Sequence, residues 1–383
     1  MTKKLNFTFV IPVLMSFFVM SFCDLVGIGV DRVKLEFALS NTMAQLIPSA
    51  VFVWFFILSV PIGILQDRIG KRNMVNIGMG ITALGLFVPF LIYTFTTVLF
   101  GFALLGIGNT IVQVSANPLL VDVVPSNRTS SFLSFSQFIK AIGSMIAAPL
   151  AGFFALKFGD WKILFLVFGV VSVLSVLWLS MIRIDETKNL EKRATFGSSF
   201  GLLGTGFIVM MVMGIFLVVG IDVGVNAVSG QFLLNKFHSP QTFCESGRSV
   251  YFFGKMLGTF GGALMLTLLP SRKFFLWSSI LALISILALI FAPSAMSAMV
   301  IIFIIGLGVA NIFPLIFSLA VEKYPVRTNE ISGLMIMAVS GGAVIPLLIG
   351  SLTDNVGVTA GMLVLVACAV YELFTAAMNL KKV

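Results

Sequence analysis

Acidic side chains interrupt the first apolar stretch of the chain. The segment from Phe17 to Phe37, FFVMSFCDLVGIGVDRVKLEF, begins as an apolar run and then carries Asp24 and, seven residues later, Asp31. A carboxylate at membrane depth costs about 2.5–3.5 kcal/mol on insertion scales, so it is retained where it faces water or a partner. Asp24 is therefore a candidate for binding a proton or another cation within a membrane.

Other polar side chains recur inside apolar stretches at spacings that place them on one helix face. Residues three or four apart share a face, and a stripe of amides can hydrogen-bond a hydroxylated solute. The candidate solute-binding residues are Asn109, Gln113, Asn117, Gln137 and Lys140, with Asp222, Asn226 and Asn311 later in the chain. The alternative for the amides is helix packing, where such bonds contribute about 0.6 kcal/mol each.

One basic residue, Lys140, lies deep inside its apolar stretch. It is about ten residues, or roughly 15 Å, from the start of the stretch, which places it near the middle of a membrane. An ion pair between Lys140 and Asp24 is an open alternative to separate roles for the two. Protonation of Asp24 would then change the energy of a desolvated pair by several kcal/mol.

The composition is that of a membrane protein. Of the 383 residues 59% are hydrophobic and 10% charged, whereas soluble domains are about 25% charged. Sixteen of the 24 basic residues fall in alternate loops and termini, and six fall in the others. Basic residues favour the cytoplasmic side, so both termini are expected there. This distribution also explains the net charge of +9 without a nucleic-acid partner.

The apolar stretches predict twelve spans, since each needs about 20 residues. They start near residues 6, 43, 74, 97, 130, 161, 201, 247, 274, 297, 330 and 359. A polar segment, IDETKNLEKRATFGSS, separates six spans from six. The predicted domains are an N-terminal bundle over 1–183, a cytoplasmic linker over 184–199 and a C-terminal bundle over 200–383.

The two halves repeat at an offset close to 200 residues. Asp24 is matched by Asp222 in the first span of each half. In the fourth span of each half the matched residues are Gly106, Gly108, Asp122 and Pro125 with Gly306, Gly308, Glu322 and Pro325. Parallel six-span repeats related by an axis along the membrane normal are a known transporter plan. The predicted fold is therefore an all-α membrane protein of twelve transmembrane helices in two pseudo-symmetric six-helix bundles.

The loop after the second span carries a longer motif, GILQDRIGKR, over residues 63–72. It resembles the signature of the major facilitator superfamily, in which Gly, Asp, a basic residue, Gly and two basic residues occur at this spacing. The resemblance implies a latch between cytoplasmic helix ends. Its expected members are Gly63, Asp67, Arg68, Gly70 and Arg72, with Arg128 as the partner of Asp67. The equivalent loop of the second half lacks the motif, so the latch is expected on one side.

Within that superfamily the chain resembles the fucose/glucose/galactose cation-symporter branch. The resemblance rests on QVSANP at 113–118, FGK at 253–255 and FPLIFSL at 313–319. Gly27 and Gln113 stand where fucose/proton symporters carry acids, so Asp24, one turn earlier, is expected to take the first acid's role. Lys140 stands in place of a neutral amide. H⁺ and Na⁺, the latter near Asp24, both remain candidates, as do neutral and anionic sugars.

The expected function is import of a sugar or related hydroxylated solute by cation symport with alternating access. We expect a monomeric multi-pass protein of a bacterial inner membrane, with no cofactor. The alternatives are a drug/proton antiporter on the same fold and a membrane sugar sensor that does not transport. An enzyme is not expected, because the sole histidine, His238, lies in a loop without a matching nucleophile or metal ligand. No phosphate-binding loop for ATP occurs either.

Overall fold

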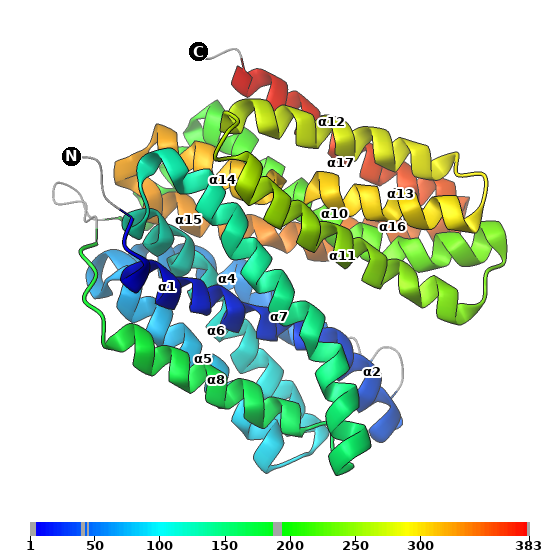
Figure 1. Cartoon of the computed structure of the whole chain (residues 1–383), viewed down its shortest axis with the longest axis horizontal. Coiled ribbons are helices and arrows are strands. Elements are labelled where there is room, and N and C mark those ends of the chain that lie inside the picture. The colour runs from blue at the N-terminus through cyan, green and yellow to red at the C-terminus, as the bar shows by residue number, and fades with distance from the viewer. Residues whose placement is uncertain (1–4, 40–42, 44–45, 187–193, 381–383) are drawn as a thin grey trace. The chain divides into compact units, whose positions relative to one another are not determined.

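The structure is a computed structural model that describes residues 5–39, 43, 46–186 and 194–380 (Figure 1). The regular secondary structure of these residues is helical. The helices before the linker are α1 (Phe7–Met20), η1 (Ser21–Leu25), α2 (Val26–Glu36), α4 (Leu46–Ile69), α5 (Lys71–Leu91), α6 (Phe95–Val123), η2 (Ser126–Arg128), α7 (Thr129–Phe158) and α8 (Ile163–Ser180). Those that follow are α9 (Phe196–Gly201), η3 (Leu202–Gly204), α10 (Gly206–Phe237), α11 (Gln241–Met265), α12 (Ser271–Ile290), α13 (Ala295–Val309), α14 (Ile312–Lys323), η4 (Pro325–Arg327), α15 (Thr328–Met337), η5 (Ala338–Ser340), α16 (Gly341–Val356) and α17 (Val358–Leu380).

The predicted spans correspond to these helices. Within the described residues, eleven helical segments are long and apolar enough to cross a membrane, and they begin within a few residues of the predicted starts. The remaining predicted span, near residue 247, corresponds to α11, a 25-residue helix that carries Arg248 and Lys255. The prediction of a twelve-helix, all-α architecture is confirmed.

The repeat seen in the sequence is also present in the structure, because the fourth span of each half begins with the same type of helix cap. Helix α6 starts with a capping box, in which the side chains of Thr94 and Thr97 bond each other's backbone N–H groups. Helix α13 starts in the same way with Ser294 and Ser297. A capping box satisfies two N–H groups that have no partner within the helix. The two halves therefore share local structure as well as spacing.

Matched glycines permit matched close packing between helices. Gly106 of α6 lies against the backbone of Val51 in α4, and Gly306 of α13 lies against the backbone of Tyr251 in α11. Two residues on, Gly108 and Gly308 contact the backbones of α5 and α12 respectively. A Cβ at any of the four positions would collide with backbone atoms. Helices packed this closely need small residues at the contact.

Contacts divide the chain into two compact units. The first unit contains Met1–Thr129, Ile139–Gly201 and Tyr324–Met337, and the second contains Ser130–Phe138, Leu202–Lys323 and Ala338–Val383. Helix α15 thus packs with α4 and α6 of the first unit, although it lies in the second half of the sequence. The predicted domain boundaries at 183 and 200 stay a prediction, and residues 187–193 of the predicted linker lie outside the described residues.

An ion pair occurs at matching positions in the two repeats. In each repeat it joins the start of the third span, α5 or α12, to the end of the fourth span, in α6 or α14. In the first unit Lys71 Nζ lies 2.5 Å from Asp122 Oδ2, and their side chains are 3% and 5% exposed. In the second unit Arg272 Nη2 lies 3.4 Å from Glu322 Oε1, and their side chains are 32% and 60% exposed. The pairs match by position but differ in burial, so they should contribute differently to stability.

We expect Asp122→Ala to destabilise the protein strongly and Glu322→Ala to have little effect. Removing one partner of a buried pair leaves an uncompensated charge and costs about 3–5 kcal/mol, whereas an exposed pair is worth about 0–1 kcal/mol. The melting temperature of the purified protein in detergent measures both. Equal losses in the two variants would show that burial does not distinguish the pairs.

Candidate functional site

Asp24 lies at an irregular turn of the first span. Helix α1 ends at Met20, a 3₁₀ turn covers Ser21–Leu25, and α2 continues the helix. The other four residues of this turn are buried, whereas the Asp24 side chain is exposed. A 3₁₀ segment inside a longer helix often marks a functional hinge. The turn therefore presents one carboxylate from an otherwise buried segment.

The partner of Asp24 is a hydroxyl group on α7. Ser144 Oγ donates a hydrogen bond to Asp24 Oδ2, and the neighbouring Gly143 lies against Ser21. Ser21 and Asp24, three residues apart, therefore face the same helix. The side chains of Ile28 and Asp31, further along this segment, lie outside the described residues.

The suggested Asp24–Lys140 ion pair is not among the pairs formed by the described side chains. Lys140 is half-buried on α7, one turn before Ser144, and its carbonyl oxygen accepts a bond from the Ser144 hydroxyl at 3.1 Å. Gln137 is also half-buried. The structure therefore connects Asp24 to the Lys140 backbone through Ser144, and it leaves the role of the ammonium group a prediction.

The predicted amide stripe on α6 is buried. Asn109, Gln113 and Asn117 are 4%, 8% and 2% exposed. Asn117 Nδ2 donates to the Gln113 carbonyl oxygen at 2.9 Å, while Oδ1 of both Asn109 and Asn117 has no hydrogen-bond partner among the described residues. A buried acceptor without a partner is unusual in a native structure and calls for an explanation. The two Oδ1 atoms are available to a donor such as a hydroxyl group.

The second unit pairs its repeat-related carboxylate with a cation. Asp222 Oδ2 lies 2.6 Å from Lys255 Nζ, and Tyr251 donates its hydroxyl hydrogen to Asp222 Oδ1 at 2.6 Å. Both partners come from α11, four residues apart and therefore on one face of the helix. Asp222 was predicted to bind solute, and here its two oxygens are engaged by protein groups.

The remaining predicted solute-binding residues lie in the second unit. Asn311 is 1% exposed at the break between α13 and α14, and its Nδ2 donates to the Gly258 carbonyl oxygen of α11 at 2.7 Å. Pro314 lacks an N–H group, which favours a break in the helix one turn earlier. Asn311 thus ties the broken segment to its neighbour. The Asn226 side chain lies outside the described residues.

The glycines of the loop motif have two distinct structural roles. Gly63 on α4 faces Gly333 on α15, and a Cβ at Gly63 would lie 2.8 Å from the Asn329 carbonyl oxygen. Gly70 has φ +93°, a conformation that side-chain-bearing residues rarely adopt, and it directly precedes α5. One glycine allows close helix packing, and the other allows the sharp turn between α4 and α5.

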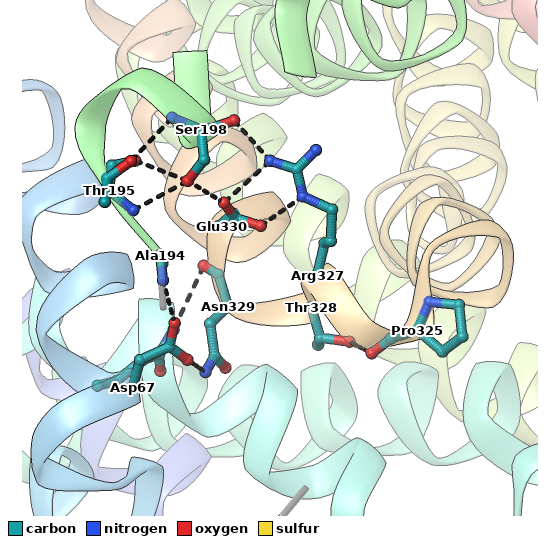
Figure 2. Close-up of polar contacts among 10 residues, drawn as sticks. Asp67, Ala194, Thr195, Ser198, Pro325, Arg327, Thr328, Asn329 and Glu330 are labelled. Atoms are coloured by element: carbon teal, nitrogen blue, oxygen red, sulfur yellow. Dashed lines mark hydrogen bonds and ion pairs between the residues drawn. The ribbon is translucent and has the colours of Figure 1, made fainter. Parts of the chain in front are cut away.

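Both oxygens of Asp67 accept hydrogen bonds within the first unit. Asn329 of α15 donates to Oδ1, and the backbone N–H of Ala194 donates to Oδ2 at 3.0 Å (Figure 2). Arg128 was predicted to be this partner, but it is exposed and the Asp67 oxygens are bonded to other groups. That prediction is wrong for this structure. Asn329, which faces Asp67, lies at the start of α15, directly after the turn η4 that matches η2 in the repeat.

The basic residues of the motif stabilise helix ends. Arg72 Nε donates to the Leu179 carbonyl oxygen at 3.0 Å, and its Nη2 donates to the carbonyl oxygen of Ser180, at the end of α8. Arg68 is exposed. Glu186 accepts bonds from the backbone N–H groups of Lys71 and Arg72 at 2.6 and 3.0 Å, at the start of α5. Charges placed this way complement the partial charges of helix termini.

A second cluster fixes the C-terminal end of the predicted linker to α15. Arg327 donates from Nε and Nη2 to the two oxygens of Glu330 at 2.6 and 2.9 Å, and Nη2 also bonds the Ser198 carbonyl oxygen at 2.6 Å (Figure 2). The Ser198 hydroxyl donates to Glu330. Asp67 and Glu330 thus hold the two ends of the short segment Ala194–Ser198.

The sequence analysis missed Asn329, Ala194, Glu330 and Glu186 as members of this site. A signal for part of it was present, because Pro125 and Arg128 recur as Pro325 and Arg327 in the repeat. The 3₁₀ turns η2 and η4 occupy these matching positions. The repeat alone did not say which of the two turns faces Asp67.

The chain was compared with family models, curated proteins and solved structures. Residues 12–346 match the model of the Major Facilitator Superfamily. A glucose/galactose transporter of Brucella abortus is 28% identical over 369 residues, covering 90% of this chain and 87% of its own. A putative glucose/galactose transporter of Helicobacter pylori is 27% identical over 397 residues, covering 96% and 95%.

Solved structures share the fold over nearly the whole chain. A crystal structure of the fucose:proton symporter FucP of E. coli superimposes with a TM-score of 0.84 at 18% identity, covering 97% of this chain and 99% of that one. The proton:xylose symporter XylE superimposes with a TM-score of 0.79 at 13% identity, covering 98% and 95%. The protein is a multi-pass membrane transporter, not an enzyme, and it belongs to the Major Facilitator Superfamily.

Proposed function

We propose that the protein imports a small sugar by cation symport with alternating access, and that Asp24 binds the coupling cation. The observation that carries the coupling role is the contrast between two repeat-related carboxylates. Asp222 is neutralised by Lys255 at 2.6 Å, whereas Asp24 is exposed and its partner is the Ser144 hydroxyl. A carboxylate without a fixed cation can take up and release one during a transport cycle.

The sugar assignment is supported by relatives that align along most of the chain. Those of Brucella abortus and Helicobacter pylori are named as a glucose/galactose transporter and a putative one. We propose a hexose as substrate, with the free acceptors of Asn109 and Asn117 as candidate contacts for its hydroxyl groups. Gln113, Gln137, Lys140, Asn226 and Asn311 remain proposed contributors, and Lys140 would favour an anionic sugar.

A proton is the first choice for the coupling cation. A 114-residue part of the chain is 31% identical to a protein named L-fucose-proton symporter. A carboxylate whose partner is one hydroxyl group can hold a proton without further ligands, whereas Na⁺ needs several more oxygen ligands. We propose Na⁺ as the second choice, and a bacterial inner membrane with cytoplasmic termini as the setting, on the distribution of basic residues.

We further propose that Asp67 and Asn329 form a latch at the cytoplasmic end of the first unit. The Asn329 bond ties α15 to α4, so releasing α15 requires this bond to break, while the second Asp67 oxygen holds the backbone of Ala194. A hydrogen bond to a charged group is worth about 1.5–3 kcal/mol. That energy is large enough to bias one conformation over another by a factor of about 10 to 100.

In proteoliposomes, Asp24→Asn should retain exchange of radiolabelled glucose or galactose across the membrane and should lose accumulation driven by an inward proton gradient. The amide keeps a hydrogen-bonding group beside Ser144 but cannot bind a proton. Accumulation is expected to fall at least about tenfold, which corresponds to about 1.4 kcal/mol of lost coupling. The measurement compares counterflow with uptake under an imposed pH or Na⁺ gradient.

The matched control is Asp160→Asn, at an exposed pair with Lys162, which should leave both activities unchanged. Accumulation that persists in Asp24→Asn would exclude Asp24 as the coupling residue. Expulsion of a drug by an outward-acid gradient would favour the antiporter, and ligand binding without flux would favour the sensor.

Loss of the latch should expose the buried face of α15 to the cytoplasmic side. In a background with the native cysteines replaced, a cysteine introduced by Ser332→Cys would report on α15, because Ser332 is 0% exposed and donates to the Val114 carbonyl oxygen. Adding Asn329→Ala should speed labelling by a membrane-impermeant maleimide about tenfold, since about 1.4 kcal/mol or more of latch energy is lost.

The control for the latch is Asn73→Ala, which removes an exposed asparagine bonded to the carbonyl oxygen of Ile69. It should leave the labelling rate unchanged. Equal rates with and without Asn329→Ala would mean that the Asp67–Asn329 bond does not hold α15 in place.

A further inference from the structure

Glu372 is a buried carboxyl group that the proposed mechanism does not use. It lies on α17 within the second unit and is 0% exposed. Neither Oε1 nor Oε2 has a hydrogen-bond partner among the described residues. Native proteins rarely leave such a group without a partner, because burying an isolated carboxylate costs many kcal/mol.

Among the described residues, no cationic side chain forms an ion pair with Glu372. Across from it, α10 presents Gly214, whose position leaves room for the carboxyl group, and α14 presents Ile316 at the same contact. The nearest titratable groups are Cys368 and Tyr371 on α17 itself, and the Tyr371 hydroxyl donates to the Met210 carbonyl oxygen at 3.3 Å. Neither group is positively charged at neutral pH.

The charged residues on the helices around Glu372 are engaged elsewhere or lie towards helix ends. On α10, Asp222 is paired with Lys255, and it is eight residues, or about 12 Å, beyond Gly214. The others on α10, α12, α14 and α16 are Lys236, Arg272, Lys273, Glu322, Lys323 and Asp354. Of these, the side chain of Asp354 lies outside the described residues. The carboxyl group is therefore compatible with its site when it carries a proton.

A polar stripe connects Glu372 with one end of the second unit. Thr375 and Asn379 follow it at spacings of three and four residues, so the three side chains share a face of α17. Thr375 is 0% and Asn379 6% exposed, and Asn379 Nδ2 donates to the Thr375 carbonyl oxygen at 2.7 Å. The Thr375 hydroxyl has no partner among the described residues. The stripe runs from residue 372 to residue 379, a rise of about 10 Å along the helix.

The stripe ends at a polar cavity. A cavity of about 290 Å³ is lined by Phe207, Arg272, Leu319, Glu322, Lys323 and Asn379. Its basic residues place it on the side predicted to be cytoplasmic. Asn379 is thus shared between the cavity and the stripe.

We propose that Glu372 is a second proton-binding site, which holds a proton in this conformation and exchanges it with cytoplasmic water along Thr375 and Asn379. On uptake, a proton from water in the cavity joins a carboxylate oxygen of Glu372, and on release it returns to that water. This inference deepens the proposed proton symport and rests on it. It assigns a proton-binding residue to each repeat, Asp24 in the first and Glu372 in the second.

Infrared difference spectroscopy of the full-length protein tests the site without measuring transport. The carbonyl stretch of a protonated carboxyl group should be present at neutral pH in the native protein and missing in Glu372→Gln. The control Glu322→Gln removes an exposed acid of the same unit and should leave the band intact. Absence of the band, or its persistence in Glu372→Gln, would overturn the proposal.

Transfer to D₂O tests the route. The band should shift as the carboxyl proton is replaced, and Asn379→Leu should slow this shift about tenfold. The matched control is Asn355→Leu, because Asn355 is exposed on α16 and makes the same kind of bond, to the Ser351 carbonyl oxygen at 2.8 Å. A band that never shifts, or shifts equally fast in both variants, would refute exchange along the stripe.

The two proposals fail separately. Uptake driven by Na⁺ with an intact, exchangeable Glu372 band would overturn proton symport while supporting the carboxyl assignment. Proton-driven uptake with no Glu372 band would support proton symport and overturn the assignment of a protonated Glu372. The melting temperature of Glu372→Gln should stay close to that of the native protein, so that loss of the band cannot be attributed to unfolding.

Discussion

The energetic cost of charge in an apolar environment governs this structure. An ionised side chain away from water needs a counter-charge, access to water or a proton. Lys71 and Asp122 show the first solution, since both are buried and they lie 2.5 Å apart. Asp24 is exposed beside a hydroxyl group, and we propose the second solution for it. Glu372, buried without a partner, requires the third.

A related constraint shapes the loop motif. Gly63 and Gly333 bring the backbones of α4 and α15 close enough for the Asp67 carboxylate to reach Asn329. The same carboxylate also fixes the backbone of Ala194. A longer side chain at either glycine would separate the helices and lengthen these bonds. The motif therefore combines steric access with charge, and neither part suffices alone.

The sequence predicted features that depend on local spacing. Twelve apolar stretches, the repeat of Gly106 and Gly306 and the loop motif all correspond to observed elements. The sequence could not predict a contact when two similar segments are both candidates to make it. Arg128 and Arg327 occupy matching turns, and only the three-dimensional structure shows that the second turn brings Asn329 to Asp67. Pairwise contacts across about 260 residues have no periodic signature.

Divergence between the repeats offers a physical basis for coupling. If both repeats treated their first-span carboxylate alike, both sites would be neutralised or both would be free. Lys255 and Tyr251 fix the charge of Asp222, while Asp24 has a hydroxyl partner. A cation that binds Asp24 thus changes the charge of one repeat and not of the other. A ligand shifts a conformational equilibrium only through different affinities for the two states, and such an asymmetric charge is one way to obtain that difference.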